Sequence, residues 1–151
     1  MTEDEQPKTP VDSIAQLVDL VELQSVEFFE LSARAKAGFD DSIGAEEDEP
    51  PQFRLNLQAM EGLIRVRLRA DIKARLGEVA VDAAINYTVQ NDFEVRRDLA
   101  LDFANRIAVM ALLPYMREAI HSQTTRVFGE GLLMPVLRAG DLQFTEDDSV
   151  E

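Results

Sequence analysis

The clearest pattern in the chain is the alternation of apolar and charged residues between Ile64 and Leu76. Apolar side chains occupy every second position, and basic side chains occupy most of the positions between them. A period of two residues predicts a β-strand with one buried and one solvated face. Because a slip by one residue would expose the whole apolar set, we expect the register of this strand to be fixed.

Residues 79–89 repeat the alternation, which predicts the second strand of an antiparallel hairpin. A turn at Leu76-Gly77, in which Gly77 supplies a positive φ, makes every inward pair apolar. The predicted pairs are Ala74/Val79, Ile72/Val81, Ala70/Ala83, Leu68/Ile85 and Val66/Tyr87.

Two earlier stretches, Ser25–Ala37 and Gln52–Met60, are also expected to form strands because their apolar residues alternate. In the first, one face is predicted to carry Phe29, Leu31, Ala33 and Ala35, and the other Phe28, Glu30, Ser32 and Arg34. Gly38–Pro51, between the two strands, is acidic, ends in a proline pair and predicts a loop.

Leu99–Phe128 has apolar residues at helical spacing and predicts one helix of about 45 Å. Asp98 is expected to cap its start, and Gly129–Gly131 to end it. Pro114 removes one backbone donor, so we expect a kink at this point but no end to the helix.

The segment Ile107–Met116 is apolar almost all the way round, and one sheet covers only one side of a helix. Either this helix is the deeply buried core of a monomer, or a second subunit covers its other side. We favour the second alternative, a dimer or tetramer. The expected interface residues are Ile107, Met110, Leu113, Tyr115 and Met116.

Thr9–Leu23 predicts a short amphipathic helix before the first strand. The element order therefore predicts an α+β fold: a four-stranded antiparallel sheet, a long helix packed on one face and a short N-terminal helix. We divide the chain into an acidic arm (residues 1–22), one domain (23–144) and an acidic, disordered tail (145–151).

Charge is unevenly distributed along the chain. Of its 29 acidic residues, 14 lie in residues 1–51 and five in residues 141–151, which leaves a nearly neutral middle with ten acidic and twelve basic residues. Acidic flanks disfavour nucleic acid and anionic membranes as partners. The acidic start differs from the cationic and then apolar start of a signal peptide, so we expect a cytoplasmic protein. The apolar part of the helix is too short for a membrane span.

No residue pattern in the sequence indicates catalysis. The chain has no cysteine and one histidine, His121, which has no partner at the spacing of a metal site or a catalytic pair. Its glycines form no phosphate-binding loop. We therefore expect no enzyme, no metal and no cofactor. The excess of apolar surface points instead to binding of another protein.

The chain resembles the SecB family of export chaperones over about residues 23–144. The helix centre Leu113–Glu118 (LPYMRE) is similar to the family's Phe-Pro-Tyr-Ala-Arg-Glu motif. The hairpin Ile72–Glu78 (IKARLGE) is similar to a strand turn of the family. Three later segments are also similar to segments of the family: the helix end at Arg126, Met134-Pro135-Val136 and Leu142-Gln143-Phe144.

This resemblance implies a homotetramer that holds unfolded precursor proteins in hydrophobic grooves without ATP and delivers them to the translocase motor SecA. It implies client binding at Phe53, Leu55, Leu57, Leu132, Leu133 and Leu137. It implies contacts with SecA at Glu30, Leu76 and Glu78.

Two departures from the family pattern favour alternatives. The outer sheet face is expected to be basic (Arg65, Arg67, Arg69, Lys73 and Arg75) where the family has an acidic one. We expect the family's last helix to be absent, because Gly140 and the acidic tail offer no helical apolar stripe. The added helix expected at Thr9–Leu23 is instead similar to SecB-like chaperones that protect an antitoxin in toxin–antitoxin systems. An antitoxin chaperone is therefore the first alternative, and an oligomeric adaptor without chaperone activity is the second.

Overall fold

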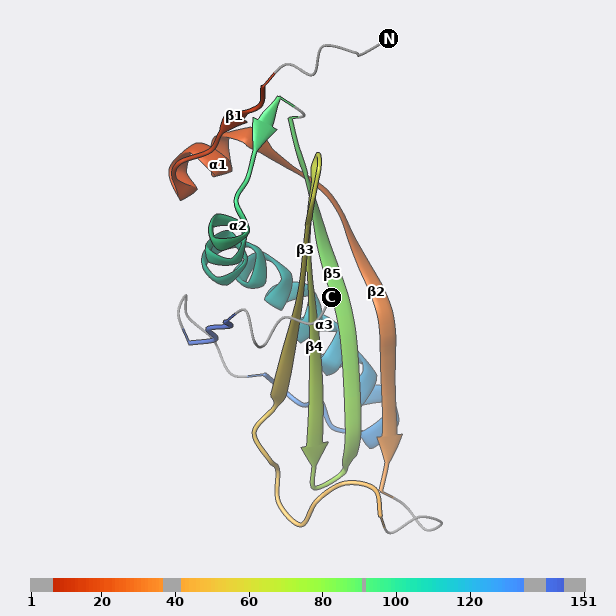
Figure 1. The fold of residues 1–151 in the computed structure, drawn as a ribbon. Helices are drawn as coiled ribbons and strands as arrows, with labels where there is room; N and C mark the ends of the chain where they lie inside the picture. Colours follow the sequence, from red (N-terminus) through yellow and green to blue (C-terminus); the bar gives the residue numbers. More distant parts are fainter. Residues whose placement is uncertain (1–6, 37–41, 91, 135–140, 146–151) are drawn as a thin grey trace.

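The computed structural model describes residues 7–36, 42–90, 92–134 and 141–145. A four-stranded antiparallel sheet carries one long helix across one face, which confirms the predicted α+β fold (Figure 1). The strands of the sheet are β2 (Val21–Ala35), β3 (Gln52–Met60), β4 (Leu63–Ala74) and β5 (Gly77–Val89). The remaining short elements are β1 (Thr9–Pro10), α1 (Ile14–Leu20) and β6 (Phe93–Glu94).

The strand order is β2-β5-β4-β3, so the two strands that precede the hairpin form the two edges of the sheet. Residues 42–51, the crossover segment that leads into β3, pass beneath the β4–β5 turn (Figure 1). Backbone hydrogen bonds from Ala45 to the carbonyl of Ala74 and from Glu49 to that of Lys73 hold the end of this crossover. β1 and β6 form a separate parallel pair near the N-terminus.

The predicted hairpin register is wrong by two residues. Ile72 pairs with Val79 and Ala74 with Gly77, so the turn consists of Arg75 and Leu76. The same side chains still face inward, because a shift of two preserves the face. Gly77 begins β5 with φ 155°, and a Cβ there would lie 2.0 Å from the carbonyl oxygen of Arg34 and 2.6 Å from the Phe128 ring. The positive φ is present as predicted, and close packing against β2 and the helix is a second reason why this position requires glycine.

The first long strand also differs from its predicted alternation. β2 starts at Val21, inside the predicted N-terminal helix, and the register shifts between Leu23 and Ser25 and between Phe28 and Glu30. The second bulge leaves Phe29 outside the ladder, so Phe28 and not Phe29 shares the inner face with Leu31 and the alanines that follow it. Continuous alternation could not reveal an inserted residue.

The helix runs without interruption from Arg97 to Phe128. Its three parts are α2 (Arg97–Phe103), a π-helical segment η1 (Ala104–Ala108) and α3 (Val109–Phe128). The prediction that Asp98 caps the helix is wrong, since Arg96 is the capping residue and Asp98 lies in the first turn. There its negative charge still interacts favourably with the helix dipole. Pro114 lies inside α3 without ending it, and Gly129 ends the helix in a left-handed conformation, both as predicted.

One hydrophobic core joins the inner face of the sheet, the helix and the N-terminal arm. Val11 and Leu17 of the arm are fully buried in the same cluster as Leu68 and Ile85 of the sheet and Phe103 of the helix. The Tyr87 and Phe103 rings meet edge to face at 5.0 Å. The expectation that the apolar part of the helix is too short for a membrane span is wrong by length and composition, but half of its most apolar window is buried inside the structure, which fits a core helix.

The two glycines at Gly77 and Gly129 provide a matched test of this packing. We expect Gly77→Ala to lower the free energy of unfolding by about 3 kcal/mol, because the new methyl group clashes with a backbone oxygen and an aromatic ring. Gly129→Ala meets nothing within 4 Å and should cost about 1 kcal/mol, from its left-handed backbone alone. Urea unfolding at one protein concentration measures both. Equal costs would show that Gly77 is not packed as described.

Candidate polypeptide-binding site

The predicted client-binding residues fall into two groups. Leu55 and Leu57 of β3 are buried in the core and Phe53 is half-buried beside them. After the helix, Leu132 is half-buried and Leu133 is 70% exposed. The sixth residue, Leu137, lies outside the described residues. The core therefore already uses the central leucines of β3, and Leu133 is the predicted residue most accessible to a client.

A segment near the C-terminus is inserted into the same core. Phe144 is 9% exposed and belongs to the buried cluster that includes Leu55 and Leu57. Along residues 141–145 the side chains are alternately exposed and turned inward, with Leu142 half-buried and Phe144 buried. This alternation is typical of an extended chain lying on an apolar surface.

Asn105 holds this segment by its main chain. The Phe144 N–H donates to Asn105 Oδ1 at 2.8 Å, and Asn105 Nδ2 donates to the Phe144 carbonyl oxygen at 2.9 Å. One side-chain amide thus satisfies both backbone groups of one residue, as a neighbouring strand would. In Figure 1 the segment, in dark blue, lies on the side of the molecule where α2 is seen.

Sequence reasoning missed Asn105. It lies in the π-helical segment η1, where Ala104 and Ala108 are buried and Arg106 is exposed. π-Helical turns inside α-helices occur frequently at functional sites. The asparagine itself was the available signal, because asparagine is a poor helix former and brings an amide that needs partners.

The helix leaves an apolar stripe that its own sheet does not cover, which we call the helix stripe. Leu113 and Met116 of the predicted interface are buried within the chain, whereas Ile107 and Met110 are half-buried and Tyr115 is 47% exposed. The helix stripe consists of Ile107, Met110, Ala111, Pro114 and Tyr115. The neighbouring edge strand β2 exposes further apolar side chains on its inner face: Leu23, Phe28 and Leu31.

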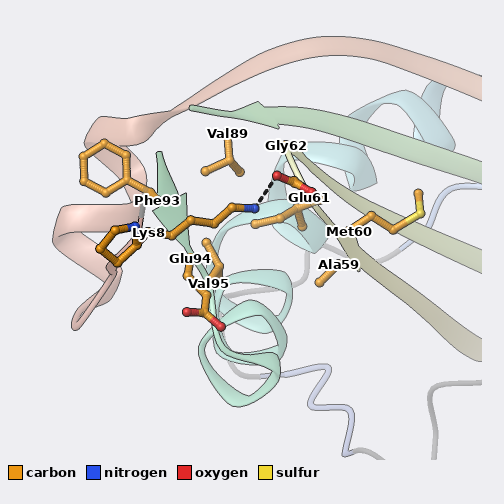
Figure 2. Close-up of a pocket in the computed structure, with 11 residues that line it drawn as sticks. Lys8, Ala59, Met60, Glu61, Gly62, Val89, Phe93, Glu94 and Val95 are labelled. Carbon is orange, nitrogen blue, oxygen red and sulfur yellow. Dashed lines mark hydrogen bonds and ion pairs between the residues drawn. The ribbon is translucent and has the colours of Figure 1, made fainter. Parts of the chain in front are cut away.

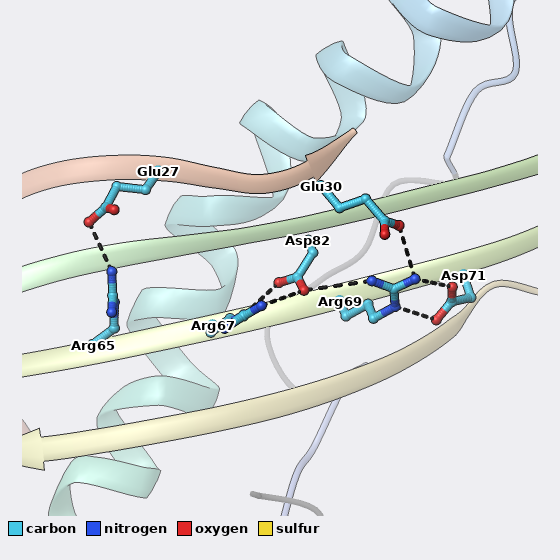
Figure 3. A network of polar contacts seen from close by, with 7 residues as sticks. All are labelled: Glu27, Glu30, Arg65, Arg67, Arg69, Asp71 and Asp82. Atoms are coloured by element: carbon cyan, nitrogen blue, oxygen red, sulfur yellow. Dashed lines mark hydrogen bonds and ion pairs between the residues drawn. The ribbon is translucent and has the colours of Figure 1, made fainter. Parts of the chain in front are cut away.

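The outer face of the sheet is not the basic surface that the sequence suggested. Its three central arginines are paired with carboxylates from three strands (Figure 3). Arg65 contacts Glu27 at 3.0 Å, Arg67 contacts Asp82 through two bonds of 2.8 Å, and Arg69 contacts Glu30 and Asp71 at 3.0 Å. Reading one strand alone could not show that its neighbours supply the opposite charges.

Asp82 is the centre of this charge network. The Asp82 residue is 6% exposed, and the hydrogen bonds with the Arg67 guanidinium hold the pKa of its carboxylate below the ordinary value. The same bonds raise the pKa of Arg67. The Phe29 ring lies over Arg67, with 4.1 Å between the ring centroid and Cζ. The bulge in β2 thus places an aromatic ring on the charged face, where it shields the ion pair.

The three residues expected to contact SecA have partners within the chain. Glu30 contacts Arg69, and Glu78 accepts a hydrogen bond from the Gly44 amide at 3.2 Å. Leu76, in the hairpin turn, is half-buried. Such contacts would have to loosen before either carboxylate could bind a partner.

A cavity of about 650 Å³ lies at the end of the sheet near the N-terminal arm (Figure 2). Lys8 and Glu61 form an ion pair there, beside Met60, Val89 and Phe93. Among the described residues, no three histidine or acidic side chains lie close enough to hold a metal ion. The walls of the cavity are thus partly apolar and partly charged.

Comparisons with known proteins give the following matches. No protein-family model matches the chain. The chain is 28% identical to the SecB-like chaperone SmegB of Mycolicibacterium smegmatis over 143 residues, which cover 93% of this chain and 92% of that protein. The solved structure of the Mycobacterium tuberculosis Rv1957 SecB-like chaperone, in complex with a ChAD peptide from the Rv1956 HigA1 antitoxin, matches with a TM-score of 0.68 and 15% identity, and covers 82% of this chain and 95% of that one.

A structure of a protein of unknown function from Streptococcus agalactiae matches with a TM-score of 0.49 and 10% identity, over 77% of this chain and 97% of that one, and supports no argument. The first two matches confirm the resemblance to SecB-like chaperones and the SecB-like fold that the sequence predicted. The name of the first match also supports the predicted chaperone function.

The Arg67–Asp82 pair can be tested through its pH dependence. We expect Arg67→Met to lower the free energy of unfolding by about 2 kcal/mol at pH 7, because it leaves a buried carboxylate without its main partner. Asp82 has a lowered pKa when folded, so the pair stabilises the protein above about pH 4 and this stabilisation is lost as the pH falls through the folded pKa. The difference between wild type and variant in urea unfolding should therefore shrink below pH 4. A difference that stays constant down to pH 2 would contradict this assignment.

Proposed function

We propose that this relative of SecB-like chaperones is an ATP-independent holdase that binds unfolded or precursor polypeptides and keeps them competent for translocation in the cytoplasm. The observation that carries the proposal is the similarity to a protein named as a SecB-like chaperone along nearly the whole chain. The open apolar side chains of the inner face and of the segment after the helix support it physically.

Burial of apolar client surface supplies the binding energy in this proposal. A groove that hides about 500 Å² of a client contributes on the order of 12 kcal/mol before ordering costs, at about 25 cal/mol per Å². Much of this is lost when the client and the groove become ordered, which leaves an affinity in the micromolar range for each site. Long clients that occupy several sites are then preferred.

We further propose that the chain assembles into a dimer or tetramer through the helix stripe and the free edge of β2. The helix stripe presents Ile107, Met110 and Tyr115 outside their own sheet. Within the part of the chain that the structure describes, β2 is an edge strand that pairs on one side only, with β5. Such edges in monomers are open to pairing with another chain. A second copy that pairs there would cover both surfaces at once.

A chaperone of an antitoxin is the second candidate function. The Mycobacterium tuberculosis structure that shares this fold was solved with a peptide of an antitoxin. The arm with α1, which packs into the core through Leu17, was the sequence feature that first suggested this subgroup. An adjacent toxin–antitoxin gene pair would favour this candidate over a general role in export.

For delivery in export we propose SecA as the partner, through Leu76, Glu30 and Glu78. Since both carboxylates are engaged within the chain, we expect weak binding in titration calorimetry. Tight binding that Glu78→Lys abolishes would contradict this expectation.

The holdase activity is tested by light scattering of a chemically denatured protein diluted into buffer. We expect the chain to slow aggregation at near-stoichiometric ratios without nucleotide or metal. Leu133→Ser should weaken this protection several-fold, because the contribution lost with one leucine is about 1 kcal/mol or more. Met60→Ser, at another exposed apolar residue (58%), is the matched control and should retain protection. Absence of protection by the wild type would favour the adaptor interpretation.

Assembly is tested by light scattering of the purified chain at micromolar concentration. We expect a dimer or tetramer for the wild type and dissociation for Tyr115→Asp, because an acidic group buried in an apolar interface costs several kcal/mol. Met60→Asp should leave the assembly unchanged. A monomeric wild type, or equal effects of the two variants, would overturn the proposed interface.

A further inference from the structure

The contact between Asn105 and Phe144 has the properties of a peptide-binding site that is occupied by the chain's own residues. Both main-chain groups of Phe144 are bound by one side chain, at 2.8 and 2.9 Å. Recognition of this kind is independent of the residue's identity, because every residue except proline offers the same N–H and C=O. Selectivity comes instead from the buried ring of Phe144.

The residues before Phe144 alternate between the core and solvent. Leu142 turns inward and is half-buried, whereas Gln143 between them is exposed. Extended peptides are bound in the same way elsewhere: main-chain bonds give affinity and pockets for alternate side chains give specificity. The location in a π-helical turn is a second, independent feature typical of functional sites.

We propose that Asn105 and the surrounding core surface form a binding site for an extended polypeptide segment with a large apolar side chain, and that Leu142–Phe144 occupies it as an intramolecular competitor. The proposal rests on the proposed function and deepens it, because it names the atoms that bind a client's main chain. The preferred client residue is phenylalanine-like, with a second apolar residue two positions before it.

A tethered competitor raises the affinity that a client needs in order to occupy the site. A segment joined to its site by a short chain has an effective concentration in the millimolar range. Such a segment reduces the apparent affinity of a competing peptide in proportion to the fraction of molecules in which the site is open. Only clients that engage several sites displace it efficiently, so folded proteins with a single exposed aromatic residue are not retained.

The test uses the full chain and a fluorescent peptide with the sequence of residues 141–145. Phe144→Ser removes the apolar anchor of the competitor, so we expect the peptide to bind this variant about tenfold more tightly than the wild type in fluorescence anisotropy. Adding Asn105→Ala to the variant should lower that affinity by about tenfold, because two main-chain hydrogen bonds are lost. Gln143→Ala, at the exposed neighbour, is the matched control and should bind as the wild type does.

Equal affinities of wild type and Phe144→Ser, or no effect of Asn105→Ala, would overturn the proposal. If the variants do not fold, as judged by circular dichroism, the wild type decides. Saturating peptide should then shift the Phe144 amide resonance in NMR, and an unchanged resonance would overturn the proposal as well.

An aggregation assay with the same proteins separates this proposal from the proposed function. Protection of clients without peptide binding would overturn the Asn105 site and leave the holdase intact. Peptide binding without protection would support the site and overturn the holdase.

Discussion

The fold depends on covering an apolar helix. The sheet buries the side of α3 that carries Leu112, Leu113 and Met116, and this contact makes up much of the core. A helix with apolar residues on most sides cannot bury all of them against a single sheet. The arm and the segment at Phe144 extend the same buried cluster, and the helix stripe remains open. A protein built in this way retains apolar surface that another chain can cover.

The sheet separates this apolar side from a charged one. On the outer face, arginines of β4 lie between carboxylates of β2, β4 and β5, so the face is polar and its charges are internally balanced. Ion pairs of this kind contribute little stability when they are exposed, but Asp82 is buried and needs its arginine. In our proposal, polypeptides therefore bind on the inner side of the sheet and along the helix, where the accessible side chains are apolar and not charged.

The strands and the helix could be predicted from the sequence because each has its own period. Alternation located β3, β4 and β5 to within a few residues, and helical spacing located the long helix. What failed depended on neighbours: the bulge at Phe29, the turn at Arg75 and Leu76 and the pairing of the arginines all require knowledge of the adjacent strand. The proposed holdase function rests on the resemblance to SecB-like chaperones and not on the periodicity of the sequence. Asn105 was missed because its partner lies 39 residues away in a segment that has no secondary structure of its own.

The central claim is that the inner side of this molecule binds unfolded polypeptide. Hydrogen–deuterium exchange of the full chain, with and without a permanently unfolded protein such as reduced and carboxymethylated α-lactalbumin, tests it most directly. The account predicts that exchange changes in η1, in the segment around Leu133 and in residues 141–145, and stays the same at the crossover beneath the β4–β5 turn. Changes confined to that crossover, or no change at saturating client, would contradict it.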